Sequence, residues 1–448
     1  MASAAERLAA NVNLGVFAKA TELKKRIWFT LGCLVVYRLG TYIPIPGIDS
    51  AILAEIFRTQ AGGLLGMFDM FAGGALGRMT IFALNIMPYI SAAIIMQLMT
   101  AVSPKMEQLK KEGEQGRKKI NQYTRYGTVL LAAVQAYGLA IGVEGMRGPG
   151  GSAVIDPGFF FRFTTVVTIV GGTMFLMWLG EQITARGVGN GISLIIFAGI
   201  VANLPHALAS MLELSRTGAM SAGFIIFLLL MAVAVITFVV FMERAQRRIV
   251  VQYPKRQVGN RMYGGDSSHL PLKINTSGVI PPIFASSLLL MPATIASFSA
   301  QGQGPEWLTA MVAYLGHGQP LYLLLYVGLI IFFAFFYTAV VFNPEETADN
   351  LRKYGGFIPG IRPGKNTAAY LDYVLTRLTV VGALYLALVC LLPEILISQY
   401  SVPFYFGGTS LLIVVSVTMD TVAQVQSHLL AHQYEGLIRK SKLRGRRG

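Results

Sequence analysis

The sequence predicts an all-α integral membrane protein with ten transmembrane helices, and three observations carry that prediction. Hydrophobic residues make up 54% of the 448 positions and charged residues only 13%, about half the charged share of a soluble domain. Ten apolar windows follow one another, each bounded by charges, Gly or Pro and each near the ~20 residues that a helical crossing needs. None alternates as a barrel strand does, so only helices can pair their backbone amides in lipid.

The ten windows divide into five plus five. An odd number of crossings per half makes the second half enter the membrane with opposite orientation. We therefore expect two inverted five-helix halves, 27–210 and 222–425, with a cleft between them, although no sequence echo between the halves is evident. The windows lie near 27–43, 80–103, 126–143, 162–180, 192–210, 222–242, 276–298, 320–342, 374–396 and 404–425.

The Lys and Arg residues predict the orientation, because positive charge is retained on the cytoplasmic side of short loops. Of the 37 basic residues, 31 lie in the N-terminal segment, in alternate loops and in the tail. We therefore expect both termini, 1–26 and the basic tail 426–448, to be cytoplasmic. The first 20 residues lack a long apolar region, so we expect no cleaved signal peptide. The basic segments are 1–26, 104–125, 181–191, 243–275, 343–377 and the tail.

One apolar stretch, Ala61–Ala75, does not fit the pattern of crossings. Its 15 residues include five glycines and Asp69, so it is too short and too glycine-rich to span the bilayer. Segments of this length are re-entrant or interfacial, and irregular backbone at that depth must be buried in protein or face water. A re-entrant segment and a short helix on the outer surface remain equally compatible with the residues alone.

The chemistry that the sequence lacks points to a passive role. No Gly-rich phosphate loop occurs, and the centres of the windows contain almost no ionisable residues, which a proton-coupled carrier would need. Cys33 and Cys390 lie inside apolar windows, and His428 and His432 share a helical face without further ligands nearby. We expect no enzyme activity, no cofactor and no metal site. A carrier of inverted-repeat type and an intramembrane hydrolase stay open as alternatives.

Two long loops, 243–275 and 343–377, are the most prominent features outside the bilayer. Both are basic and both exceed the length that a connection needs. Clustered Arg could dock an acidic partner, either RNA phosphate or a protein surface. The alternative, that these charges only fix topology and touch anionic lipid, has about equal weight on the residues alone.

Several strings resemble the SecY family of protein-conducting channels, and the resemblance runs from about Leu23 to the basic tail. The strings are YRLGTYIPIPGID at 37–49, FAGGALGRMTIFALNIMPYISAAIIMQL at 71–98, KKEGEQGRKKINQYTRYGT at 110–128, GEQITARGVGNGISLIIFAGI at 180–200, VFNPEETADNLRKYGGFIPGIRPG at 341–364 and VPFYFGGTSLLIVV at 402–415. The resemblance implies a ten-helix clamshell in the bacterial inner membrane, with a pore between the halves and a plug that closes it.

The resemblance also implies a function and partners. The chain would pass unfolded secretory polypeptides across the membrane and release apolar segments sideways into lipid. The implied partners are SecE and SecG in a heterotrimer, the SecA ATPase or the ribosome as the driving partner, the precursor polypeptide and membrane lipids. Arg362 is the implied contact for the motor or ribosome, with Arg256 and Arg261 as weaker candidates.

Residue roles carried over from the family fall into three groups. A pore ring of aliphatic side chains, which can seal by dewetting, maps onto Ile86, Ile90, Ile192, Ile196, Ile283 and Ile413. A lateral gate between the second and seventh windows maps near Ser91, Asn190 and Met291. The plug maps onto Leu64, Leu65, Met67, Phe68, Met70 and Phe71.

Two residues beside the implied ring depart from the family pattern. Asn85 stands where glycine is usual, and Pro282 gives IPPI where IPAI is commoner. An amide next to the constriction could make the closed state wetter or pair with a polar group of the gate. The hypothesis that follows is a shifted gating balance.

Overall fold

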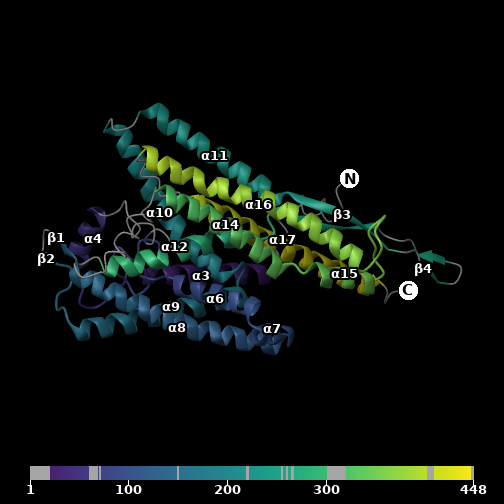
Figure 1. The fold of residues 1–448 in the computed structure, drawn as a ribbon, viewed down its shortest axis with the longest axis horizontal. Coiled ribbons are helices and arrows are strands. Elements are labelled where there is room, and N and C mark those ends of the chain that lie inside the picture. The colour runs from purple at the N-terminus through teal and green to yellow at the C-terminus, as the bar shows by residue number, and fades with distance from the viewer. Residues whose placement is uncertain are drawn as a thin grey trace.

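The structure is a computed structural model, and it describes residues 21–59, 69, 72–148, 151–217, 221–253, 256–258, 261–263, 267–299, 319–400 and 408–444. It is an elongated bundle in which most helices run roughly along the long axis (Figure 1). Each of the ten predicted windows contains a helix. These helices are α3 (Thr21–Gly40), α6 (Met87–Val102), α8 (Glu114–Gly145), α9 (Phe159–Arg186), α10 (Gly191–Arg216), α11 (Ala222–Arg244), α12 (Ile280–Ser299), α14 (Pro320–Val341), α16 (Lys365–Tyr400) and α17 (Gly408–Arg444).

Within the described residues, seven helices are long and apolar enough to cross a membrane. The number rises to eight if α6 and α7 (Pro104–Lys111), which meet at a bend of 98°, count as one span. The α3 helix has a mixed composition because Lys24, Lys25 and Arg26 lie in its first turns. By length and composition, the structure therefore supports a multi-spanning helical protein.

The second window begins later than predicted. Residues 72–86 form a series of turns, and the helix starts only at Met87, with Pro88 in its first turn. Gly73 and Gly74 have φ of 67° and 81°, and Met79 and Asn85 have φ of 48° and 49°. Positive φ is incompatible with a right-handed helix, so apolar composition alone placed the start of this helix too early.

The basic loops contain more regular structure than a loop assignment implies. Strands β3 (Gln246–Gln252) and β6 (Ser267–Lys273) form an antiparallel ladder, with β4 (Arg256–Val258) and β5 (Arg261–Tyr263) pairing beyond it. The second loop contains α15 (Pro344–Lys353), capped by the Asn343 side chain, which accepts from the N–H groups of Glu345 and Glu346. The all-α prediction therefore describes the bundle but not the strands of the basic loop 243–275.

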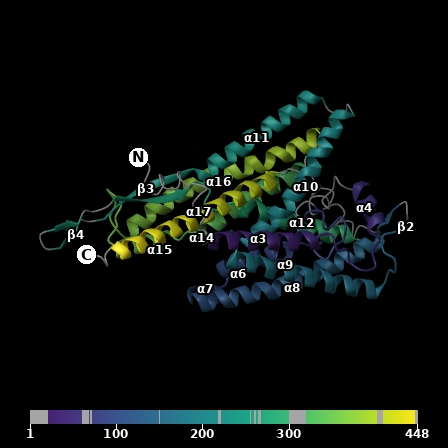
Figure 2. The same ribbon diagram turned by 180° about the vertical axis from the view of Figure 1, so that it is seen from behind.

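The two basic loops are joined to each other. Gln252 and Phe357 exchange backbone hydrogen bonds of 2.9 and 3.0 Å, and side chains of the ladder pack in one apolar cluster with Ile358 and Leu371. Figures 1 and 2 show β4, α15 and α7 toward one end of the bundle, whereas α4 (Ser50–Thr59), β1 (Arg147–Gly148) and β2 (Gly151–Ser152) lie at the other. The elements that hold most of the basic loop residues thus share one end of the molecule.

Helix contacts fall mainly within two groups. In the first, α8 packs against α6 and α9, and α3 against α9 and α10; in the second, α14 packs against α12 and α16, and α16 against α17. Contacts of α12 with α6 and α8, and of α10 with α17, connect the groups. The largest buried apolar cluster draws on both groups, and it is where the candidate site lies.

Candidate pore and gate

The six predicted ring residues lie in one apolar cluster, although they come from four helices. Ile90 lies on α6, Ile192 and Ile196 on α10, Ile283 on α12 and Ile413 on α17, while Ile86 is the residue just before α6. Four of the six are buried members of the cluster, and Ile192 and Ile283 pack against it half-buried. The structure brings these isoleucines together, and their role as a pore ring stays a prediction.

The start of α10 shows how the sequence positions two of these residues. Asn190 caps the helix, since its Oδ1 accepts hydrogen bonds from the N–H groups of Ile192 and Ser193. Gly191 lies so close to Gly180 of α9 that a Cβ would collide with the Gly180 carbonyl oxygen. The capping amide and the close glycine contact therefore fix where the face that carries Ile192 and Ile196 begins.

The two helices of the predicted lateral gate contact each other, because α6 packs against α12. Ser91 is buried on α6, and Met291 lies in α12, although its side chain is outside the described part. Asn190 is exposed at the start of α10, where its amide serves as the helix cap. The placement of these residues leaves the gate assignment a prediction.

The six predicted plug residues, Leu64, Leu65, Met67, Phe68, Met70 and Phe71, lie outside the described residues. Asp69 is described, and its Oδ1 accepts a 2.7 Å hydrogen bond from the N–H of Gly77. Burial raises the pKa of the Asp69 carboxyl, whereas this hydrogen bond and the Arg78 guanidinium lower it. The base of the predicted plug segment is therefore tied to the turns that precede α6.

The part played by Arg38 was not predicted from the sequence. The Arg38 Nη1 donates a 2.8 Å hydrogen bond to the carbonyl of Gly73. Arg38 and Arg78 both lie over the Tyr42 ring, at 5.0 and 4.3 Å from its centroid. An arginine inside an apolar window, followed by a second arginine after a glycine-rich stretch, was the available signal.

The docking residues are placed to different extents. Arg362 is exposed in the turn before α16, at the basic end of the molecule. Arg256 and Arg261 begin β4 and β5, but their side chains lie outside the described part. Among the described residues, no three His, Cys, Asp or Glu side chains come together as metal ligands.

This architecture is that of a multi-spanning helical membrane protein in which several helices share one large buried apolar cluster. The family model described as SecY matches residues 80–422. The Protein translocase subunit SecY of Escherichia coli (strain K12) is 59% identical over 424 residues, covering 95% of this chain and 96% of the relative. The corresponding subunit of Rickettsia conorii is 58% identical over 423 residues, covering 94% and 97%. The chain belongs to the SecY family, and the resemblance found in the sequence is confirmed.

Solved structures agree on the fold. The structure described as that of a protein conducting channel superposes with a TM-score of 0.66 at 19% identity, covering 91% of this chain and 92% of the other. Sec61 in the canine ribosome-channel complex from the endoplasmic reticulum superposes with a TM-score of 0.65 at 18% identity, with the same coverage. At these identities the likeness establishes the fold alone.

Proposed function

We propose that this chain is the pore-forming subunit of a protein translocase, a passive channel that conducts unfolded polypeptides across the bacterial inner membrane. The observation that carries the proposal is the single apolar cluster formed by isoleucines from α6, α10, α12 and α17. Aliphatic walls of this kind exclude ions by dewetting and can close around a passing chain. The 59% identity to a protein translocase subunit supports the same function.

The proposed architecture is a ten-helix clamshell of two inverted halves, 27–210 and 222–425, closed by a plug at about 61–75. The grouping of helix contacts supports the two halves. The gathering of the basic loops at one end supports a cytoplasmic location for that end, and with it for the segments 1–26 and 426–448. The link between Arg38 and the Gly73 carbonyl supports a tethered base for the plug.

The proposed partners supply what the chain itself lacks. Because no nucleotide-binding loop occurs in the sequence, the driving force would come from the SecA ATPase or from a ribosome, with SecE and SecG completing the heterotrimer. The joined loops 243–275 and 343–377 would form the docking surface, with Arg362 at its exposed tip. One structural neighbour is a channel in a ribosome complex, which supports ribosome docking at this surface.

Lateral release would require α6 and α12 to separate. The space between them would then expose a segment of the passing chain to lipid, where about 20 apolar residues partition favourably and charged residues do not. The contact between these two helices supports this assignment, and Ser91, Asn190 and Met291 would lie at or near the opening.

Crosslinking of an arrested precursor tests the proposed function. Cysteine replaces Ile86 or Ile283 in the assembled translocase, and a precursor is stalled during passage. With a cysteine also placed in the precursor and a mild oxidant added, we expect a disulfide to the precursor from both ring positions and none from Leu230→Cys, a control whose side chain is 65% exposed on α11. The native Cys33 and Cys390 are buried and are first replaced by Ala. Crosslinks at the control position alone, or small-solute exchange by purified vesicles, would favour a carrier instead.

A further inference from the structure

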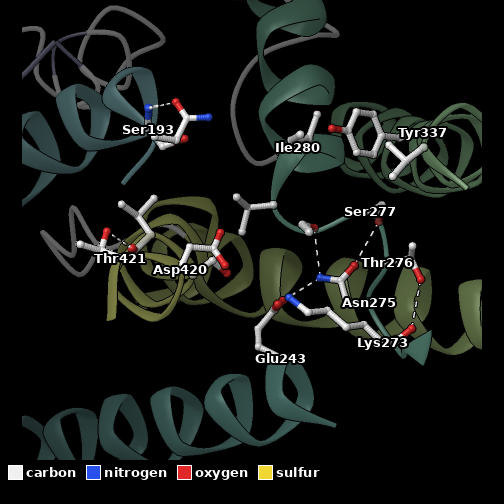
Figure 3. Close-up of a pocket in the computed structure, with 16 residues that line it drawn as sticks. Ser193, Glu243, Lys273, Asn275, Thr276, Ser277, Ile280, Tyr337, Asp420 and Thr421 are labelled. Atoms are coloured by element: carbon white, nitrogen blue, oxygen red, sulfur yellow. Dashed lines mark hydrogen bonds between the residues drawn. The ribbon is translucent and has the colours of Figure 1, made fainter. Parts of the chain in front are cut away.

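A cavity of about 280 Å³ with three charged residues in its lining lies between the start of α10, the end of α11, the junction of β6 with α12, the end of α14 and the first half of α17 (Figure 3). The ends of α11 and α14 and the start of α12 connect directly to the basic loops 243–275 and 343–377. The charged lining residues are Glu243, Lys273 and Asp420. The cavity therefore opens at the end of the molecule that we propose to be cytoplasmic.

The cavity adjoins the predicted ring on three helices. On α10, Ser193 precedes Ile196 by three residues, and on α12, Ile280 precedes Ile283 by three. On α17, which runs the other way, Ser416 and Asp420 follow Ile413 by three and seven residues. At 1.5 Å per residue these offsets are about 5 to 10 Å along the helices, so the cavity adjoins the ring, and on α10 the ring residue Ile192 lies directly beside the lining residue Ser193.

The charge of the cavity is opposite to that of its surroundings. The whole chain has a formal net charge of +15, yet two carboxylates and only one ammonium group line the cavity. Asn275 Nδ2 holds Glu243 by a 2.7 Å hydrogen bond to Oε1 and also donates to the Gly278 carbonyl at 3.0 Å. A carboxylate can accept about four hydrogen bonds. The Asn275 amide therefore positions the Glu243 carboxylate and leaves it able to accept further hydrogen bonds.

Ser416 supplies an independent observation. Its side chain lines the cavity and is only 6% exposed, but its Oγ has no hydrogen-bond partner among the described residues. Thr418 and Thr421, two and five residues further along α17, donate to the carbonyls four residues before them, each at 2.7 Å. Buried hydroxyls are nearly always paired, and a hydroxyl accepts as well as donates, so Ser416 leaves a position in the lining where a donor from outside can be accepted.

We propose that this cavity binds Lys or Arg side chains of the passing polypeptide, with Glu243, Asp420 and Ser416 as acceptors. An ammonium or guanidinium group offers several donors and no acceptor, which matches a lining of two carboxylates and an unpaired hydroxyl. Exported chains carry such residues just before their first apolar segment. This inference rests on the proposed function and adds a preference for cationic segments, held next to the ring while the apolar segment reaches the gate.

The preference can be measured with two precursors that share one apolar segment and differ only in the residues before it, two Lys or two Ser. Initial translocation rates are compared in vesicles that contain the assembled translocase. The rate of the Lys precursor divided by the rate of the Ser precursor should fall by about fivefold in the Glu243→Gln/Asp420→Asn variant. A change of this size is expected from losing partly exposed ion pairs. The rate of the Ser precursor should stay unchanged.

Matched variants separate charge recognition from structural damage. Glu114→Gln removes an exposed carboxylate at the start of α8, outside the cavity, and should keep the wild-type ratio. Asp420→Lys should reverse the preference toward a precursor with two Asp in place of the two Lys. A cysteine at Ser193 should crosslink to one placed beside the Lys pair, with a yield that falls in the double variant.

The outcomes distinguish this inference from the proposed function. If the wild type translocates neither precursor, the proposed function fails. If both precursors are translocated but the double variant slows them equally, or leaves the ratio unchanged, the cavity does not recognise cationic residues and the inference is wrong. If the ratio follows the Mg²⁺ concentration at fixed ionic strength and not the precursor charge, the carboxylates bind a divalent cation instead, which also overturns it.

Discussion

The predicted ring and the adjacent cavity share three helices but differ in charge, because only the cavity has ionisable side chains in its lining. Ile413 lies in the apolar cluster, whereas Ser416 and Asp420 on the same helix line the cavity. About two turns of α17 separate Ile413 from Asp420, and Val417 between them belongs to both the apolar cluster and the cavity lining. An apolar layer can exclude ions without recognising sequence, and a polar layer can recognise charge without sealing. The two tasks are therefore separable by mutation.

The largest effect should come from placing a polar side chain in the predicted isoleucine ring. Ile86→Asn places an amide at a fully buried position of the apolar cluster. A buried amide without partners costs up to about 3 kcal/mol, so the closed state should lose up to about a hundredfold in population relative to open or hydrated states. Ion flux through vesicles without precursor measures this effect.

The control for this change is Leu230→Asn on α11, which introduces the same amide at a side chain that is 65% exposed on the outside of the bundle. Its ion flux should remain at the wild-type level. Equal flux in the two variants would mean that the isoleucine cluster does not form the seal.

A smaller effect should follow from breaking the contact that positions α10. Gly191→Ala places a methyl group against the Gly180 carbonyl, and overpacking of this kind costs about 1–3 kcal/mol. Thermal unfolding of the detergent-solubilised protein should occur at a lower temperature. Gly171→Ala is the matched control, because a Cβ at Gly171 meets nothing within 4 Å. It should leave stability unchanged or slightly raised, since alanine favours helix over glycine.

Much of the bundle could be predicted from the sequence, because long apolar windows in lipid leave the backbone little choice but a helix. All ten windows contain one. The start of α6 was missed, since composition does not report the positive φ of Met79 and Asn85. The β3–β6 ladder was also missed, because its residues were interpreted through their charge and not through the alternation of Ile249 and Val251.

The candidate site was predictable in part. Family strings identified the six isoleucines, and the structure places them together. The cavity next to them could not be predicted, because Glu243, Asn275 and Asp420 come from segments far apart in sequence and match no motif. Only packing brings such residues together. The structure therefore adds most for solitary polar residues that match no motif, such as Glu243 and Asp420.

Glu144 offers a contrast with the cavity carboxylates, because it forms an ion pair with Arg162. It accepts from Arg162 Nε at 2.8 Å and from the Gly158 N–H at 3.0 Å, and its side chain is 9% exposed. Arg162→Met should destabilise the protein by about 1–3 kcal/mol, since it leaves a buried charge unpaired. Arg125→Met, which breaks the more exposed pair with Glu181, should cost under about 1 kcal/mol. Denaturant titration in detergent measures both, and equal losses would contradict the role of burial.

The smallest effect is expected at Asn85, the residue before the first ring isoleucine. Its φ is 49° and its Nδ2 donates to the Tyr37 hydroxyl at 3.4 Å. Asn85→Gly relieves a backbone conformation that costs roughly 1 kcal/mol for other residues but removes that weak hydrogen bond, so ion leak of the closed channel and stringency toward signal sequences should shift by only a few-fold. Asn85→Ala loses the amide and keeps the strain, so it should lower stability while glycine does not. If Asn85→Gly changes neither leak nor stringency, the asparagine does not bias gating, and the polar chemistry that matters lies wholly on the cavity side of the ring.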